Sequence, residues 1–325
     1  MRELTEATVN EFKKRYIDPS VLNIIKKRVE DFGFVPDIEA ILTCLDALSN
    51  PGVGVKNAGP FAALISDRRK ANEITFGPDG EKCRNLSMEM RRIIRESCNF
   101  PPAEKESTLV EVYDNFFNIF RIEQNNALDI YTTNYDLCFE RYCAKKRRKL
   151  NNLSNDRDRM DLELLRNKKF WNLYKLHGSS NWVITDDCEK GEIIITDMFV
   201  KPGDRTVEGG MKEEVMIYPT TEKYFLRDPY FSLLCNLRND LVAGITNKDS
   251  GFIVIIGYSF RDDAINNAFI DSLNKPVFKH KNIFLIDPDA KRIISENIPQ
   301  LNKIIEPIDK RIEELNKNDL KGFNI

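Results

Sequence analysis

The chain has 325 residues, of which 42% are hydrophobic and 31% are charged, and its formal net charge is −2. This composition is ordinary for a soluble protein, and so small a charge gives no global field that would attract nucleic acid or an anionic membrane. The sequence shows no apolar run long enough to span a membrane and no signal-peptide pattern, so we expect a cytoplasmic protein.

Cysteine usage argues against a disulfide framework and against a structural metal. The cysteines are odd in number and no two form a Cys-x-x-Cys pair. Scattered thiols of this kind are typical of reduced cysteines rather than of a zinc module. We therefore expect no zinc.

Residues 1–126 are predicted to form a mostly helical subdomain. Asp37 is a plausible N-cap for a helix over 38–48, and apolar periodicity predicts further helices over 88–98 and 108–122. No convincing core strand precedes Ala127.

Residues 127–325 have a different period, which predicts an α/β core. Strands are expected at 128–133, 172–176, 192–196, 214–218, 252–257 and 282–286, and helices at 136–146, 229–242 and 262–273. Strands that alternate with helices favour a doubly wound, mostly parallel sheet.

A charged segment, residues 144–168, is expected to be an exposed excursion from this core. It opens with the basic run 145–149, which a nucleic acid would attract. Acidic residues follow soon afterwards, so a solvated face is the favoured interpretation.

Three apolar segments end in small polar residues, at Asn134 to Asp136, at His177 to Asn181 and at Gly257 to Ser259. In open α/β sheets, ligands bind outside the carboxyl ends of the strands. His177 is one of only two histidines, and imidazole suits base chemistry near neutral pH. The other, His280, is expected in a solvated loop.

Each of these residues also has a purely structural alternative. Asp136 and Asp262 are placed to cap the helices that follow them, and Asp287 is equally well placed to cap 289–297. Asn266 has the alternative of a surface residue. Gly178 and Gly257 either form turns or allow a ligand to approach the backbone closely.

The three segments resemble the SIR2-like family, sirtuin relatives that bind and often cleave NAD. The resemblance implies a Rossmann-like fold with a helical subdomain. It implies that Asn134 positions an attacking water, that Thr133 and Asp136 belong to the element that forms the nicotinamide pocket, and that His177, next to Gly178, serves the ribose hydroxyls.

The resemblance also implies a site for the adenosine half of NAD. Gly257 and Ser259 would lie on the side of the phosphates and the adenine ribose. Asp262 and Asn266 match an Asp and an Ile-Asn that the family repeats at this spacing. Asp287 would accept hydrogen bonds from the adenosine ribose hydroxyls.

Two departures from the family pattern shape the functional expectation. The paired cysteines of the sirtuin zinc module are absent, which argues against protein deacetylation. The Gly-rich loop that usually opens such domains is also absent. We therefore expect residues 1–325 alone to bind NAD poorly and turn it over slowly, with an open strand edge at the sheet centre.

The function that the resemblance implies is NAD+ hydrolysis, with cleavage to nicotinamide and ADP-ribose, in an antiphage defence role. The alternative is a catalytically impaired or non-enzymatic sensor or interaction module for NAD or ADP-ribose. Beside NAD, the expected partner is a second copy of the chain or a protein of the same defence system. Neither a membrane nor a nucleic acid is expected as a partner.

Overall fold

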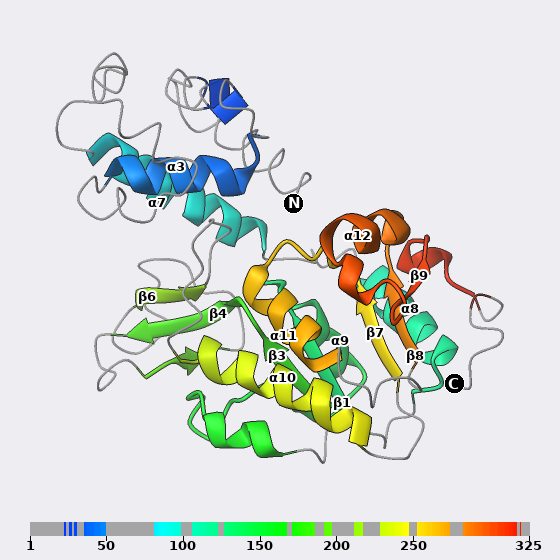
Figure 1. Ribbon diagram of the computed structural model, residues 1–325. Helices are drawn as coiled ribbons and strands as arrows, with labels where there is room; N and C mark the ends of the chain where they lie inside the picture. The colour runs from blue at the N-terminus through cyan, green and yellow to red at the C-terminus, as the bar shows by residue number, and fades with distance from the viewer. Residues whose placement is uncertain are drawn as a thin grey trace.

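The computed structural model describes residues 23, 26–27, 29–30, 36–49, 81–98, 106–122, 127–167, 171–185, 192–196, 211–216, 228–246, 252–273, 282–316 and 319. This part of the chain has a mixed α/β architecture (Figure 1). The α-helices are α3 (Ile38–Ser49), α7 (Glu81–Ser97), α8 (Glu106–Ile119), α9 (Cys138–Lys145), α10 (Tyr230–Thr246), α11 (Asp263–Leu273) and α12 (Ala290–Asn297). None of the helices in these ranges is both long and apolar enough to cross a bilayer.

Within the described ranges, nine strands are arranged in three sheets of three. The strands are β1 (Leu128–Thr132), β2 (Leu150–Asn151), β3 (Trp171–Lys175), β4 (Gly178–Thr185), β5 (Ile194–Ile195), β6 (Met211–Met216), β7 (Phe252–Ile256), β8 (Asn282–Ile286) and β9 (Glu306–Ile308). The sheet orders are β1-β3-β2, β5-β4-β6 and β7-β8-β9.

Two of the sheets are parallel, as a Rossmann-like fold requires. In the first, β1 pairs with β3 from Leu128 opposite Trp171 to Thr132 opposite Lys175. In the second, β7 pairs with β8 from Phe252 opposite Asn282 to Ile256 opposite Ile286. The predicted α/β class, with a parallel sheet and intervening helices, is confirmed.

The third sheet is antiparallel, and its central strand, β4, was not predicted. The strand begins with Gly178, Ser179 and Ser180, which are poor strand formers. It is nevertheless buried along residues 178–183, with both serines fully covered. Tertiary packing against β5 and β6 decides the conformation here.

Strands β1 and β7 are the edges at which the two parallel sheets face the middle of the core. Each pairs with one strand only among the described residues. Both are partly exposed along most of their length, whereas every residue of β3 is buried. Ile256, the last residue of β7, is 41% exposed.

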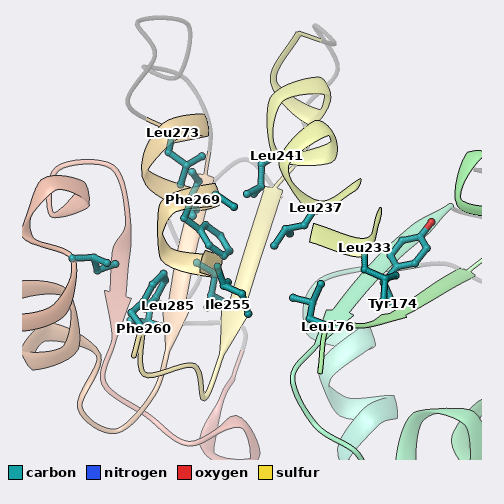
Figure 2. Packing of buried hydrophobic residues seen from close by; sticks show 14 of the residues in the cluster. Tyr174, Leu176, Leu233, Leu237, Leu241, Ile255, Phe260, Phe269, Leu273 and Leu285 are labelled. Atoms are coloured by element: carbon teal, nitrogen blue, oxygen red, sulfur yellow. The ribbon is translucent and has the colours of Figure 1, made fainter. Parts of the chain in front are cut away.

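Helices α10 and α11 cover one face of both parallel sheets. Leu233, Leu237 and Leu241 of α10 lie in one cluster with Tyr174 of β3 and Ile255 of β7 (Figure 2). Because one helix buries side chains from both sheets, a continuous apolar layer joins them on this face.

Helix α8 covers the opposite face and joins the same two sheets. The Phe117 ring lies 4.8 Å from the Trp171 ring of β3, and the Phe120 ring lies 5.3 Å from that of Phe252 in β7. The sequence places this helix in the subdomain of residues 1–126, but its side chains pack on the sheets. The boundary at residue 126 stays a prediction.

Helices α3 and α7 pack against each other beside the sheets (Figure 1). The N-cap prediction for α3 is confirmed, because the backbone N–H of Ala40 donates to Asp37 Oδ1 over 2.9 Å. Arg95, in the last turn of α7, is buried and donates to the carbonyl oxygen of Ser180 in β4 over 3.4 Å. This contact connects the helix pair to the antiparallel sheet.

The charged segment 144–168 is less exposed than its sequence predicts. Asn151 is in β2 and donates from Nδ2 to Asn172 Oδ1 of β3 over 2.8 Å, and Leu153 is fully buried. Residues 156–158 are exposed, as expected. The few apolar and amide side chains of the segment attach it to the sheet. The high charge of the segment gave no indication of this contact in the sequence.

The basic run within this segment contacts α8 and the sheet. Lys146 forms an ion pair with Asp114, and Lys145 lies 3.9 Å from Glu106. The Arg148 guanidinium lies 4.0 Å from the centre of the Trp171 ring, which is a cation–π arrangement. These intramolecular contacts favour a structural role over a nucleic-acid contact.

Candidate functional site

The loops that follow β1 and β3 lie side by side. The backbone N–H of Leu176 donates to the Thr132 carbonyl over 2.8 Å, which extends the β1–β3 ladder past the end of β3. The N–H of Ser180 donates to the Tyr135 carbonyl over 2.9 Å. The loop of Asn134 is therefore held against the segment that contains His177.

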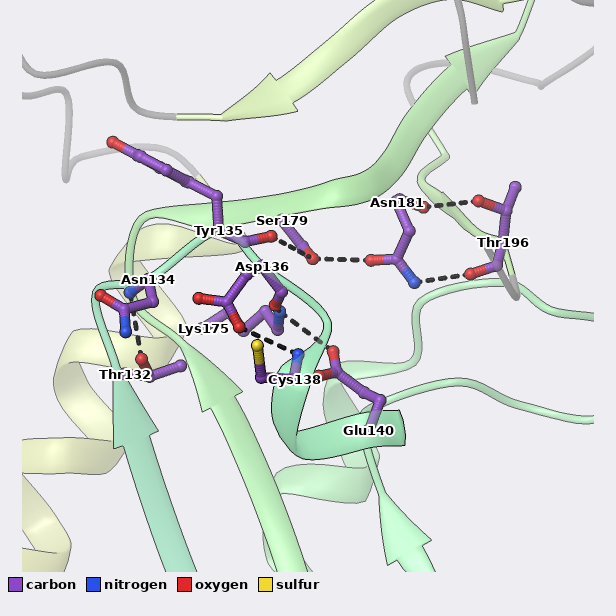
Figure 3. Close-up of polar contacts among 10 residues, drawn as sticks. All are labelled: Thr132, Asn134, Tyr135, Asp136, Cys138, Glu140, Lys175, Ser179, Asn181 and Thr196. Carbon is purple, nitrogen blue, oxygen red and sulfur yellow. Dashed lines mark hydrogen bonds and ion pairs between the residues drawn. The ribbon is translucent and has the colours of Figure 1, made fainter. Parts of the chain in front are cut away.

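Asn134 is exposed at the carboxyl end of β1. Its backbone N–H donates to Thr132 Oγ1 over 3.0 Å, and this bond fixes the turn (Figure 3). Thr133 is half-buried in the same turn. The local fold thus leaves the Asn134 side chain at the surface of the strand end, where the sequence predicts a ligand.

Asp136 performs the structural task that its position predicts. Its Oδ1 accepts the backbone N–H of Cys138, the first residue of α9, over 2.9 Å. The Lys175 ammonium donates to the Asp136 carbonyl oxygen and lies 3.0 Å from Glu140 Oε1 (Figure 3). A role for Asp136 in a nicotinamide pocket stays a prediction.

His177 and Asp262 form a buried pair that links the two parallel sheets. His177 Nε2 lies 3.0 Å from Asp262 Oδ2, and their side chains are 9% and 4% exposed. His177 follows β3, whereas Asp262 lies between β7 and α11, 85 residues further along the chain. Sequence spacing gave no sign of this contact.

Asp262 also caps α11, as one of its predicted alternatives requires. Its Oδ1 accepts the backbone N–H groups of Ala264 and Ile265, each over 3.2 Å. One carboxylate oxygen therefore holds the helix start and the other faces His177.

The two predicted glycines have different structural reasons. Gly178 has a φ of +83°, and a Cβ there would lie 2.2 Å from the Val215 carbonyl oxygen of β6. The approach of β6 therefore explains this glycine without a ligand. Gly257 has a φ of +60°, and a Cβ there would meet nothing within 4 Å. Open space thus lies beside Gly257, at the carboxyl end of β7.

Asn266 is buried, at 8% exposure, so the surface alternative is wrong. Its Nδ2 donates to the Phe260 carbonyl over 2.9 Å, and its Oδ1 accepts from the Tyr258 hydroxyl over 3.3 Å. The residue holds the loop 258–260 in place. Ser259 is half-buried in that loop, and its carbonyl accepts from Asn297 Nδ2 over 2.7 Å.

Asp287 lies next to Gly257, at the end of the neighbouring strand. The N–H of Gly257 donates to the Ile286 carbonyl over 3.0 Å. Asp287 is half-buried, and its Oδ1 accepts the N–H of Asp289 over 2.8 Å, just before α12. A local turn therefore uses one of its carboxylate oxygens.

The structure thus gathers the predicted residues at the carboxyl ends of β1, β3, β7 and β8. Sequence reasoning missed Lys175 and Glu140. Lys175 pairs with Glu140 and donates to the Asp136 carbonyl oxygen, and these contacts hold the Asn134 loop in place. The signal was present, because a lysine inside the apolar run 172–176 is unusual for a buried strand. His280 and Cys188 lie outside the described residues.

No group of three or more histidine, cysteine or acidic side chains that could hold a metal ion occurs within the described ranges. The cysteines described there are free thiols. The donors at the strand ends are amide, imidazole, hydroxyl and carboxylate groups, which suit a polar organic ligand.

Comparison with known proteins identifies the family. A family model described as SIR2-like domain matches residues 129–308, which is more than half of the chain. The chain belongs to the SIR2-like domain family. No curated protein matches it.

The SIR2-like match runs from the second residue of β1 to the last residue of β9, so strands of all three sheets lie within it. Every predicted site residue lies inside it, from Thr133 to Asp287. Helices α3, α7 and α8 precede it. Membership of the SIR2-like family indicates a function related to NAD.

Proposed function

We propose that this SIR2-like protein binds NAD+ and hydrolyses its N-glycosidic bond to give nicotinamide and ADP-ribose. The observation that carries the proposal is the contact between the loops of Asn134 and His177, joined by the Ser180–Tyr135 hydrogen bond. An exposed amide and a buried imidazole are thereby brought to one edge of the core.

The residues present fit the chemistry of NAD. The open space beside Gly257 admits a ligand to the end of β7, where backbone groups can meet a diphosphate. Asp287, at the next strand end, can accept from ribose hydroxyls. Asn134 and His177 supply groups for the other ribose.

The reaction needs little from the protein beyond orientation and polar stabilisation. The C–N glycosidic bond breaks, nicotinamide leaves with the bonding electron pair, and water forms the new C–O bond and gives up a proton. Asn134 would orient that water by its amide. His177 would bind the ribose hydroxyls, and a partly dry site would strengthen both contacts.

The test is nicotinamide release from NAD+ by residues 1–325, measured at high protein concentration. Asn134→Ala and His177→Ala should each lower the rate by about 10²–10³-fold. Asn118→Ala, on the exposed side of α8, and His280→Ala are the matched controls and should keep the parental rate. Parental turnover in both folded site variants would refute the assignment.

The second candidate is a non-enzymatic sensor of NAD or ADP-ribose. It is favoured by the structural contacts of the predicted site residues, since Asp136 and Asp262 accept backbone N–H groups at the starts of α9 and α11 and Asn266 holds the loop 258–260. Calorimetry with ADP-ribose separates the two functions, because a sensor binds it without releasing nicotinamide from NAD.

A cytoplasmic role in antiphage defence, with a second copy or a protein of the same system as partner, completes the proposal. Its support is the likeness to zinc-free SIR2-like hydrolases. NAD levels in cells challenged with phage, with and without His177→Ala, would test it.

A further inference from the structure

We infer that Asp262 is a positioning residue that holds His177 in its Nε2–H tautomer, so that Nδ1 is the nitrogen that exchanges a proton with the ligand. The kinetic part of this inference rests on the proposed function. The tautomer itself does not, because it follows from the hydrogen bonds within the protein.

The argument begins with the charge on Asp262. Its Oδ1 accepts two backbone N–H groups at the start of α11, from Ala264 and Ile265. Backbone donors and the N-terminal end of an 11-residue helix both favour the ionised carboxylate. An ionised carboxylate only accepts hydrogen bonds.

The charge on Asp262 decides the state of the imidazole. His177 Nε2 lies 3.0 Å from Asp262 Oδ2, so Nε2 must carry the hydrogen of this bond. A neutral imidazole has a single N–H, which leaves the lone pair on Nδ1. A proton taken from a ribose hydroxyl would therefore go to Nδ1, and the Nε2–H would keep its hydrogen bond to Asp262.

The burial of the His177–Asp262 pair fixes the orientation of the imidazole ring. Both side chains are at least nine-tenths buried. The ring of Tyr135 packs beside the imidazole, with 6.4 Å between ring centres. A buried ring that has both a hydrogen bond and an aromatic contact keeps one orientation, which is what a proton acceptor requires.

This role differs from the ligand contact that the sequence predicts for Asp262. A carboxylate whose two oxygens face α11 and His177 acts on the ligand through the histidine. Its loss should lower kcat and leave the affinity for NAD almost unchanged. Loss of a ligand contact would instead weaken NAD binding.

The direct test is nitrogen-15 NMR of the full chain with labelled histidine. The chain has only two histidines, so His280→Gln leaves a single imidazole to observe. The expected spectrum shows a protonated Nε2 and an unprotonated Nδ1 at alkaline pH. An Nδ1–H tautomer would overturn the inference, and this result needs no NAD turnover.

Asp262→Asn provides the second test. Asparagine caps helices as well as aspartate does, so α11 keeps its start while His177 loses its carboxylate. The Nε2–H preference should disappear and kcat should fall about 100-fold, with the Kd for NAD changed less than threefold. Asp263→Asn, exposed one residue away, is the matched control and should change neither.

The outcomes separate the two proposals. If the tautomer is as expected but the parental chain releases no nicotinamide, the proposed hydrolysis fails and the positioning of His177 by Asp262 stands. If Asp262→Asn weakens NAD binding tenfold or more and keeps the tautomer, Asp262 is a ligand contact and the inference is wrong.

Discussion

The ammonium of Lys175 lies 3.0 Å from Glu140 Oε1, and the Lys175 side chain is only 3% exposed. This ion pair joins β3 to α9, the helix that follows the loop of Asn134. Lys175 also donates to the Asp136 carbonyl oxygen. The pair therefore fixes the shape of the candidate site from inside the protein.

Lys175→Met is expected to destabilise the protein by about 3–5 kcal/mol, because it leaves the Glu140 carboxylate buried without its cation. Burial raises the pKa of Glu140. The folded state therefore binds the Glu140 proton more tightly than the unfolded chain does. Protonated Glu140 thus contributes stability at low pH, and this stability is lost as the pH rises through the folded pKa. The deficit should be smaller at about pH 5 than at about pH 8.

Urea unfolding at both pH values measures this effect. The double variant Lys175→Met with Glu140→Leu removes both charges and should recover much of the stability. A double variant as unstable as the single one would show that packing, and not the unpaired charge, causes the loss.

The two glycines should respond differently to alanine. Gly178→Ala places a Cβ 2.2 Å from the Val215 carbonyl and keeps a positive φ, so a loss of about 3 kcal/mol or more is expected. Gly257→Ala meets open space and should cost only about 1–2 kcal/mol from its left-handed backbone.

Thermal unfolding compares the stabilities, and calorimetry with ADP-ribose compares the binding. Weaker binding is expected for folded Gly257→Ala if a ligand occupies the space beside this residue. Equal losses of stability in the two variants would contradict the difference in packing.

Arg148→Ala should lower the stability by about 2 kcal/mol, because the guanidinium lies against the Trp171 ring and its stem covers apolar surface. Arg148→Lys keeps the charge but loses the planar group, so it should recover only part of the loss. Arg147→Ala, at an exposed neighbour, is the control and should change little. Chemical denaturation of the three variants gives the comparison.

The thiols with a raised pKa should react slowly. Burial, with a nearby Cys83, raises the pKa of Cys44 to about 12, and burial with the charge of Asp136 raises that of Cys98 to about 12. The thiolate is the reactive form, so at about pH 8 very little of either residue is available. Cys235 is exposed and should react first.

Titration with a thiol reagent in a Cys188→Ser variant, followed by mass spectrometry, identifies the order of modification. Cys44, which is buried, should react only after denaturation. Labelling of Cys44 before Cys235 in the native protein would contradict the burial of the α3–α7 interface.

Local signals predicted much of this fold. The Asp37 cap, the runs 128–133 and 252–257 and the helix at 262–273 are visible in the sequence because neighbouring residues decide them. Strand β4 was missed because its serines become a strand only between β5 and β6. The gathering of polar residues at strand ends was predictable from the sheet, whereas the His177–Asp262 pair depends on how two sheets are placed.

The division of the core into two parallel sheets also bears on its dynamics. Among the residues that the structure describes, each sheet has its own backbone ladder, and side chains of α8 and α10 join the two sheets. Units of this kind can open separately, and amide hydrogen exchange would then be fastest at the edges β1 and β7. The candidate site has residues on both units. A ligand bound there would contact both sheets, so that neither sheet could open alone. Its binding would therefore slow amide hydrogen exchange in both sheets, including the one with which it makes fewer contacts.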